Sequence, residues 1–156
     1  MTTSMSHLLE EISRKHFPQP PATPADIEEF ERRVGWTLDP DLRAFYLHCN
    51  GASLLRRQDP PYTIYPLPKI IRARTAIHGE DDDKWGPAKA YALCDVRDGN
   101  YVVLDVSHQL AGRYPLLDGD HETWPSLEYS TQIARSFAEF LEEIFRTRRS
   151  LYWIPG

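Results

Sequence analysis

Residues 23–51 read TPADIEEFERRVGWTLDPDLRAFYLHCNG and contain the same helix-starting pattern twice. In the first copy, Thr23 is placed to cap a helix, Pro24 suits its first position, and Asp26 completes a capping box. The pattern predicts a helix over residues 24–34. Its expected buried stripe is Ile27, Phe30 and Val34, and Gly35 is expected to end it.

The second copy follows at once, with Asp39 as the cap and Pro40 in the first turn. Its apolar stripe has the spacing i, i+3, i+4, i+7 and consists of Leu42, Phe45, Tyr46 and Cys49, before the terminating Asn50-Gly51. An earlier, weaker stripe is Leu8, Leu9, Ile12 and His16. We expect the proline-rich residues 17–21 to end that first helix and to link it to the next one.

Between Tyr62 and Leu117 the apolar period changes to two, which is typical of strands. The clearest pattern is a hairpin of residues 90–96 and 101–106 around the Asp98-Gly99 turn. Further strands are predicted over 62–65 and 113–117, and an extended or helical connection over 69–73.

The last helix is predicted from one continuous apolar face, capped by Ser130 or Thr131. That face consists of Ile133, Phe137, Phe140, Leu141, Ile144 and Phe145. The fold class is therefore α+β: N-terminal helices, a mainly antiparallel central sheet, and a long C-terminal helix packed on the sheet, all in a single domain of residues 1–156. We expect the apolar residues 151–154 to dock on the body or on a second subunit.

Composition limits the functional classes. The 156 residues carry a net charge of −5, which argues against direct nucleic-acid binding and favours a basic partner. Cys49 and Cys94 lie among apolar neighbours without a Cys-x-x-Cys spacing, so both are expected to be reduced. With no signal-peptide pattern and no apolar run of about 20 residues, we expect a cytoplasmic protein without a membrane role.

Taken together, the order of elements and the residues at their joints resemble the SUKH superfamily. This is the domain of fungal Smi/Knr-type cell-wall regulators and of many bacterial immunity proteins. The resemblance covers most of the chain, and its motifs are Ile27, Phe30 and Glu31 before Gly35; Leu38-Asp39-Pro40-Asp41-Leu42; Phe45-Tyr46; Asn50-Gly51; Tyr65-Pro66-Leu67; Asp98-Gly99-Asn100; and Ser136-Phe137 with Glu139-Phe140-Leu141.

Two positions depart from the family pattern: Asp39 stands before Pro40, and Ala52 replaces a second glycine. The resemblance implies a protein-binding domain, commonly an immunity protein that neutralises a nuclease- or deaminase-type toxin. A regulatory scaffold of the cell-wall-signalling kind is the alternative that the same resemblance allows. Either protein is expected to be a monomer or a weak homodimer.

The candidate partner surface combines acidic runs with aromatic residues in or beside predicted loops, because aromatics next to acids make good protein contacts. The expected contact residues are Tyr62, Tyr65, Glu80, Asp81, Asp82, Asp83, Trp85, Asp118, Asp120, Glu122 and Trp124. Tyr129 belongs to the same group of aromatics. Near the C-terminus, Arg146, Arg148 and Arg149 form a basic cluster, which either complements a helix dipole or makes a contact patch.

A competing hypothesis is a metal-dependent hydrolase centred on Asp118, Asp120, His121 and Glu122, since this segment is dense in possible ligands. Against it, neighbours in an extended chain point to opposite faces, and Asp-Gly-Asp is common in turns. Nucleophile, phosphate-loop and His-Glu-x-x-His motifs are missing from the sequence. We therefore expect a non-enzyme without cofactor, metal site or catalytic residues.

Overall fold

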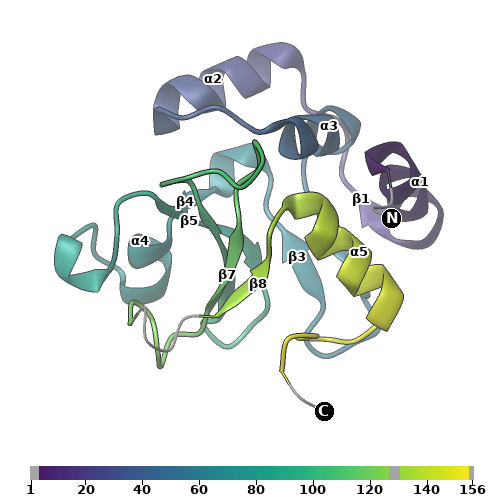
Figure 1. The fold of residues 1–156 in the computed structure, drawn as a ribbon. Helices are drawn as coiled ribbons and strands as arrows, with labels where there is room; N and C mark the ends of the chain where they lie inside the picture. The colour runs from purple at the N-terminus through teal and green to yellow at the C-terminus, as the bar shows by residue number, and fades with distance from the viewer. Residues whose placement is uncertain (1–3, 127–130, 155–156) are drawn as a thin grey trace.

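The structure, a computed structural model, describes residues 4–126 and 131–154 and has the predicted α+β arrangement (Figure 1). The helices are α1 (Met5–Lys15), α2 (Pro24–Val34), α3 (Pro40–His48), α4 (Ala73–His78) and α5 (Phe137–Thr147), with the single-turn helices η1 (Leu67–Lys69) and η2 (Asp83–Trp85). The strands are β1 (Phe17–Pro18), β2 (Ala52–Leu54), β3 (Tyr62–Ile64), β4 (Ile71–Arg72), β5 (Ala90–Asp95), β6 (Tyr101–Asp105), β7 (Leu116–Gly119) and β8 (Gln132–Ala134).

All strand pairs are antiparallel, in the order β1-β2-β3-β5-β6-β7-β8. Strand β4 pairs with the edge of β5 that also holds β3. The predicted hairpin forms the centre of the sheet as β5 and β6, with Ala90 opposite Asp105 and Asp95 opposite Tyr101. The mainly antiparallel sheet predicted from the sequence is therefore confirmed.

The capping patterns of α2 and α3 are confirmed. The Thr23 hydroxyl accepts the Asp26 N–H at 3.1 Å, and the Asp26 carboxylate accepts the Thr23 N–H at 2.9 Å. Asp39 accepts the N–H of Leu42 at 3.0 Å and, beyond its capping role, the N–H of Tyr114 at 3.0 Å. This buried carboxylate therefore ties the start of α3 to the chain that leads into β7.

The C-terminal helix begins later than predicted. Its cap is Ser136, whose hydroxyl accepts the Glu139 N–H at 3.1 Å, so Thr131 is not the cap; Ser130 lies outside the described residues. Ile133 belongs to β8, which pairs with β7. Ile133 was assigned to the helix because it is apolar and lies four positions before Phe137, which matches the helical spacing. In the structure it is a buried residue of a short strand.

Three short strands were not predicted. The expected linker at residues 17–21 begins with β1, which pairs with β2, and the three residues of β8 were assigned to a helix. The strand expected at 113–117 runs instead over Leu116–Gly119. The connection expected at 69–73 contains β4 and the start of α4.

Two apolar clusters lie on opposite faces of the sheet because alternate strand residues point in opposite directions. Val102 and Leu104 of β6 belong to the large cluster shared with α1, α2, α3 and α5, whereas Val103 belongs to a small one with Ala73 of α4 and Trp124. Cys49 and Cys94 are buried free cysteines. Helix α4 and Trp124 thus cover the second face of the sheet.

The apolar residues 151–154 dock on the body of the same chain, which is one of the two possibilities that the sequence allowed. The Tyr152 hydroxyl donates to the carbonyl of Ile133 at 2.8 Å, and the Tyr152 N–H donates to the Tyr62 hydroxyl at 3.2 Å. Trp153 packs edge-on against Tyr62 with ring centroids 6.2 Å apart. This docking decides the environment of Tyr62.

Candidate functional site

Two aromatic residues of the expected contact surface are buried, so their assignment to that surface is wrong. Tyr62 is 0% exposed: its ring lies 5.8 Å from that of Phe140, and its hydroxyl donates to the Arg149 carbonyl at 2.9 Å. Trp124 is 3% exposed and its indole N–H donates to the carbonyl of Trp85 at 3.2 Å. Both residues support the fold beneath the surface.

The acidic loop that follows α4 is exposed, as predicted, but it is also anchored. Arg74 of α4 is buried and donates to Asp81 at 2.7 Å, to Asp83, and to the carbonyl of Gly86 at 3.2 Å. Arg72 donates to Asp81 at 2.9 Å. Hydrogen bonding from Arg74 lowers the pKa of the Asp81 carboxyl. The loop is therefore held in one conformation by two arginines that precede it.

Trp85 closes the same loop. Its indole N–H donates to Glu80 at 3.2 Å, and its ring stacks on His78 with centroids 4.3 Å apart. Lys84 lies over the indole at 5.5 Å and pairs with Glu80 at 3.6 Å. The Trp85 ring is therefore in contact with His78 at the end of α4 and with Lys84 of the loop itself.

The second acidic segment is a turn. Asp120 accepts the N–H of Glu122 at 2.8 Å, and Asn100 accepts the backbone N–H of His121 at 3.0 Å and lies 2.8 Å from its Nδ1. Asp118 is half-buried on β7, where burial and then the neighbouring Asp120 raise the pKa of its carboxyl. The segment therefore combines a strand end with an exposed turn.

The geometry required by the hydrolase hypothesis is not formed. His121 is turned toward Asn100, with its Nε2 3.9 Å from Glu122 and its Nδ1 4.0 Å from Asp120. Among residues 4–126 and 131–154, no three His, Cys, Asp or Glu side chains are grouped so that they could hold a metal ion. The turn is built by hydrogen bonds instead.

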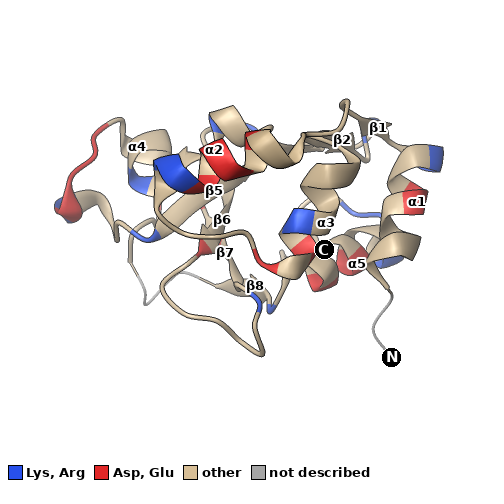
Figure 2. Ribbon diagram, turned by 90° about the horizontal axis from the view of Figure 1, so that it is seen from above, with Lys and Arg blue, Asp and Glu red and all other residues tan. Residues whose placement is uncertain are grey.

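Trp124 brings the two acidic segments together. Besides its bond to Trp85, its carbonyl lies 3.0 Å from Nε2 of His78, and its ring packs under Gly86, whose φ is +126°. We call residues 80–85 and 120–122 the acidic edge. Figure 2 shows the acidic loop beside α4 at one end of the protein, with α1 at the opposite end.

The acidic edge is less negative than its sequence suggests. The four carboxylates of residues 80–83 lie beside three cations, Arg72, Arg74 and Lys84, so the loop keeps one net negative charge. The turn adds Asp120 and Glu122. The side chain of Asp83 is 95% exposed and that of Glu122 is 79% exposed.

Tyr65 is half-buried and lies apart from the acidic edge. Its hydroxyl donates to Asp95 at 3.3 Å, and its ring is 6.5 Å from that of Tyr101. Burial, followed by the nearby Asp95 carboxylate, raises the pKa of the phenol. In the described part of the chain, the side-chain contacts of Tyr65 are with Asp95 and Tyr101, not with Trp85 or Asp120. Tyr129 lies outside the described residues.

Sequence reasoning missed Arg74, the residue that organises the acidic loop. A signal was present in the sequence, because Arg72 and Arg74 precede Asp81 by nine and seven residues. The short helix α4 lets the chain reverse direction and bring these side chains together. The pairing of His121 with Asn100 was also missed. It joins the β5–β6 turn to the turn after β7 and is invisible in a linear pattern.

The chain belongs to the SMI1 / KNR4 family (SUKH-1), and the family model matches residues 21–143. The matched range runs from the approach to α2 into α5 and so includes the whole acidic edge. No curated protein matches the chain. Within the described residues, no helix has the length and apolarity that a bilayer crossing requires.

Proposed function

We propose that this chain is a protein-binding immunity domain that neutralises a nuclease- or deaminase-type toxin by covering part of its surface. The observation that carries the proposal is membership of the SMI1 / KNR4 family, for which an immunity role is typical. The placement of His121 is consistent with it, since the densest group of possible ligands is arranged as a hydrogen-bonded turn.

The acidic edge is the proposed contact surface, and the proposed partner is basic. Asp82 and Asp83 are exposed, and Glu122 projects from the adjoining turn. Complementary charge increases the association rate and the specificity of such a complex more than its final affinity. Because Arg74 fixes the loop before binding, less conformational entropy is lost on association.

The test is capture of the partner from native cells at low and high ionic strength. A charge-dependent complex weakens with salt, because the Debye length falls from about 10 Å at 0.1 M to about 3 Å at 1 M. Support requires a basic protein that is lost at high salt, arrests growth when expressed alone, and becomes harmless when co-expressed with this chain. A harmless partner that stays bound at 1 M salt would favour the regulatory scaffold and overturn the proposal.

Charge-reversal variants locate the contact. Asp82→Lys with Glu122→Lys is expected to weaken toxin binding by at least about tenfold, since both charges face a basic partner. The matched control is Glu10→Lys with Glu29→Lys, which changes the net charge equally at exposed positions of α1 and α2. Equal weakening by both pairs would remove the acidic edge from the contact.

A further inference from the structure

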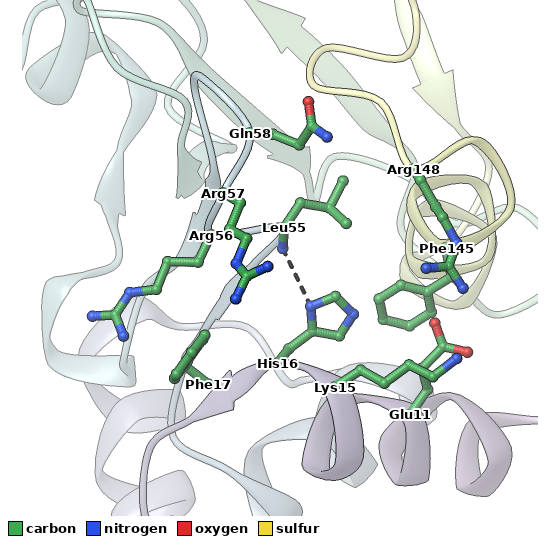
Figure 3. Close-up of a pocket in the computed structure, with 10 residues that line it drawn as sticks. All are labelled: Glu11, Lys15, His16, Phe17, Leu55, Arg56, Arg57, Gln58, Phe145 and Arg148. Carbon is green, nitrogen blue, oxygen red and sulfur yellow. Dashed lines mark hydrogen bonds between the residues drawn. The ribbon is translucent and has the colours of Figure 1, made fainter.

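A second surface lies at the other end of the protein, between the C-terminal ends of α1 and α5 and the turn that follows β2 (Figure 3). It is a pocket of about 370 Å³. Arg56 and Arg57 come from one side, Lys15 and Arg148 from the other, and His16 lies between them. We call this the basic pocket.

The basic pocket concentrates positive charge in an acidic protein. Its lining holds four cationic side chains and one carboxylate, that of Glu11, so it carries three net positive charges in a chain whose net charge is −5. The cations come from three separate segments of the chain. Their convergence is a property of the fold.

These cations are also unpaired. In the described residues, neither Lys15 nor Arg56, Arg57 or Arg148 has a carboxylate or carbonyl partner, and Arg43 is the one other arginine in that condition. The remaining arginines pair with carboxylates, namely Arg14, Arg32, Arg72, Arg74, Arg97, Arg113, Arg135 and Arg146, or donate to carbonyls, namely Arg33 and Arg149. Three of the four unpaired arginines therefore line one pocket.

Helix dipoles account for only part of this charge. Lys15 stands in the last turn of α1, and Arg148 caps the C-terminus of α5. Each helix end contributes about half a negative charge, which falls off within its last turn. Arg56 and Arg57 stand in a turn outside any helix, and four full positive charges exceed the two half charges and Glu11 together.

The walls of the basic pocket are ordered and partly apolar. Arg56 lies over the ring of Phe17 at 4.3 Å, and the ring of His16 stacks on Phe145 at 5.0 Å. Phe17 is 50% exposed, so half of its side chain remains available to an occupant of the pocket. An occupant with both carboxylates and an apolar side chain would find a partner for each.

His16 fixes the floor. Its Nδ1 accepts the N–H of Leu55 at 3.2 Å, so the neutral ring carries its proton on Nε2. Leu55 has a φ of +50°, in the left-handed region that residues with a side chain disfavour. The bond to His16 thus holds the turn that presents Arg56 and Arg57.

We infer that the basic pocket binds an acidic peptide segment of a partner protein, with carboxylates on Arg56, Arg57 and Arg148 and an apolar side chain on the Phe17 and Phe145 rings. The inference goes beyond the proposed function, because it does not require the partner to be a toxin. A nucleic acid fits less well, because the net charge of −5 repels an extended polyanion whose phosphates continue beyond the pocket.

The experiment is a fluorescence-anisotropy titration of the full chain with a fluorescein-labelled peptide, Glu-Asp-Phe-Glu-Leu-Asp-Glu, at low salt. Arg56→Gln with Arg57→Gln is expected to weaken binding by at least about tenfold, and Arg148→Gln by a smaller factor. Arg43→Gln, the matched unpaired arginine on α3, is expected to change the affinity by less than about twofold. Thermal melts verify that each variant is folded.

The inference would be overturned if the parent protein does not bind this peptide, if Arg43→Gln weakens binding equally, or if the peptide binds equally well with Gln and Asn in place of its acids. Competition separates the sources of negative charge. Displacement of the peptide by equimolar inorganic phosphate or by a single-stranded oligonucleotide would also contradict a peptide site. Loss of toxin capture with peptide binding intact would affect the proposed function alone.

Discussion

At one end of the protein, a run of four acidic residues is anchored through Asp81 and Asp83 by two arginines, Arg72 and Arg74, from the chain just before it. At the other end, cations from α1, from the turn after β2 and from the end of α5 line one pocket, and none of them forms an ion pair within residues 4–126 and 131–154. The first cluster is obvious in the sequence and nearly neutralised in space. The second is scattered in the sequence and concentrated in space.

This difference shows that a run of like charges in the sequence does not by itself give the charge of a surface. The surface potential depends on which charges the fold brings together as ion pairs. Surface ion pairs contribute little to stability, typically about 0–1 kcal/mol. Their larger effect here is to decide which side chains remain available to a partner. The following predictions test whether the charges at the two ends differ as the geometry indicates.

The largest effect is expected in the core that both ends share. Phe140→Ala should lower the free energy of unfolding by about 3–5 kcal/mol, because it leaves a cavity beneath Tyr62 and Phe137. Phe17→Ala, in the basic pocket, should cost less than about 1 kcal/mol because half of that side chain is exposed. Denaturant titration measures both changes. Equal losses of unfolding free energy in the two variants would contradict the assignment of Phe140 to the core.

A smaller effect is expected at the acidic edge. Arg74→Met removes the bonds to Asp81, Asp83 and the Gly86 carbonyl, so the melting temperature should fall and residues 80–86 should become sensitive to proteolysis. The control is Arg97→Met, which loses one exposed pair with Asp59. Equal melting temperatures for the two variants would show that Arg74 does not anchor the loop.

The basic pocket should respond to pH through His16. Burial, opposed by Glu11 and then aided by Arg148 and Lys15, lowers the pKa of this histidine below its ordinary value of 6.5. The unfolded chain therefore binds the proton more readily, and His16 contributes a loss of stability as the pH falls through 6.5 toward the folded-state pKa. His16→Gln should therefore lose less unfolding free energy than the parent protein between pH 7 and pH 5, as measured by urea titration at each pH. Equal losses in the parent protein and the variant would contradict the prediction.

The smallest effect is expected for Arg57→Gln. An unpaired, exposed arginine should change the free energy of unfolding by no more than about 0.5 kcal/mol, with a slight gain at low salt because the remaining cations repel each other less. Chemical denaturation at two ionic strengths measures this. A loss above about 1 kcal/mol would give Arg57 a structural role and remove the contrast between the two ends.

Local signals in the sequence were sufficient for α2, α3 and the central hairpin. The caps Thr23, Asp26 and Asp39 act within a few residues, and the Asp98-Gly99 turn joins neighbouring strands. Strands β1, β2 and β8 have two or three residues each, so they carry too little alternation to be recognised without their partners.

The candidate surface was less predictable because exposure depends on distant contacts. Tyr62 was expected to contact a partner, yet residues 149–153, about ninety positions later, cover it. Trp124 was expected at the surface, and it lies beneath Gly86. The exposure of residues 80–83 was predicted correctly because four adjacent carboxylates cannot be buried together.

The most direct test of the proposed partner contact is hydrogen exchange, followed by mass spectrometry, on the protein alone and in complex with its captured partner. We predict that backbone amides of residues 80–86 and 120–124 exchange more slowly in the complex, while those of the exposed face of α2 keep their rates. Unchanged exchange at the acidic edge in an intact complex would contradict the account.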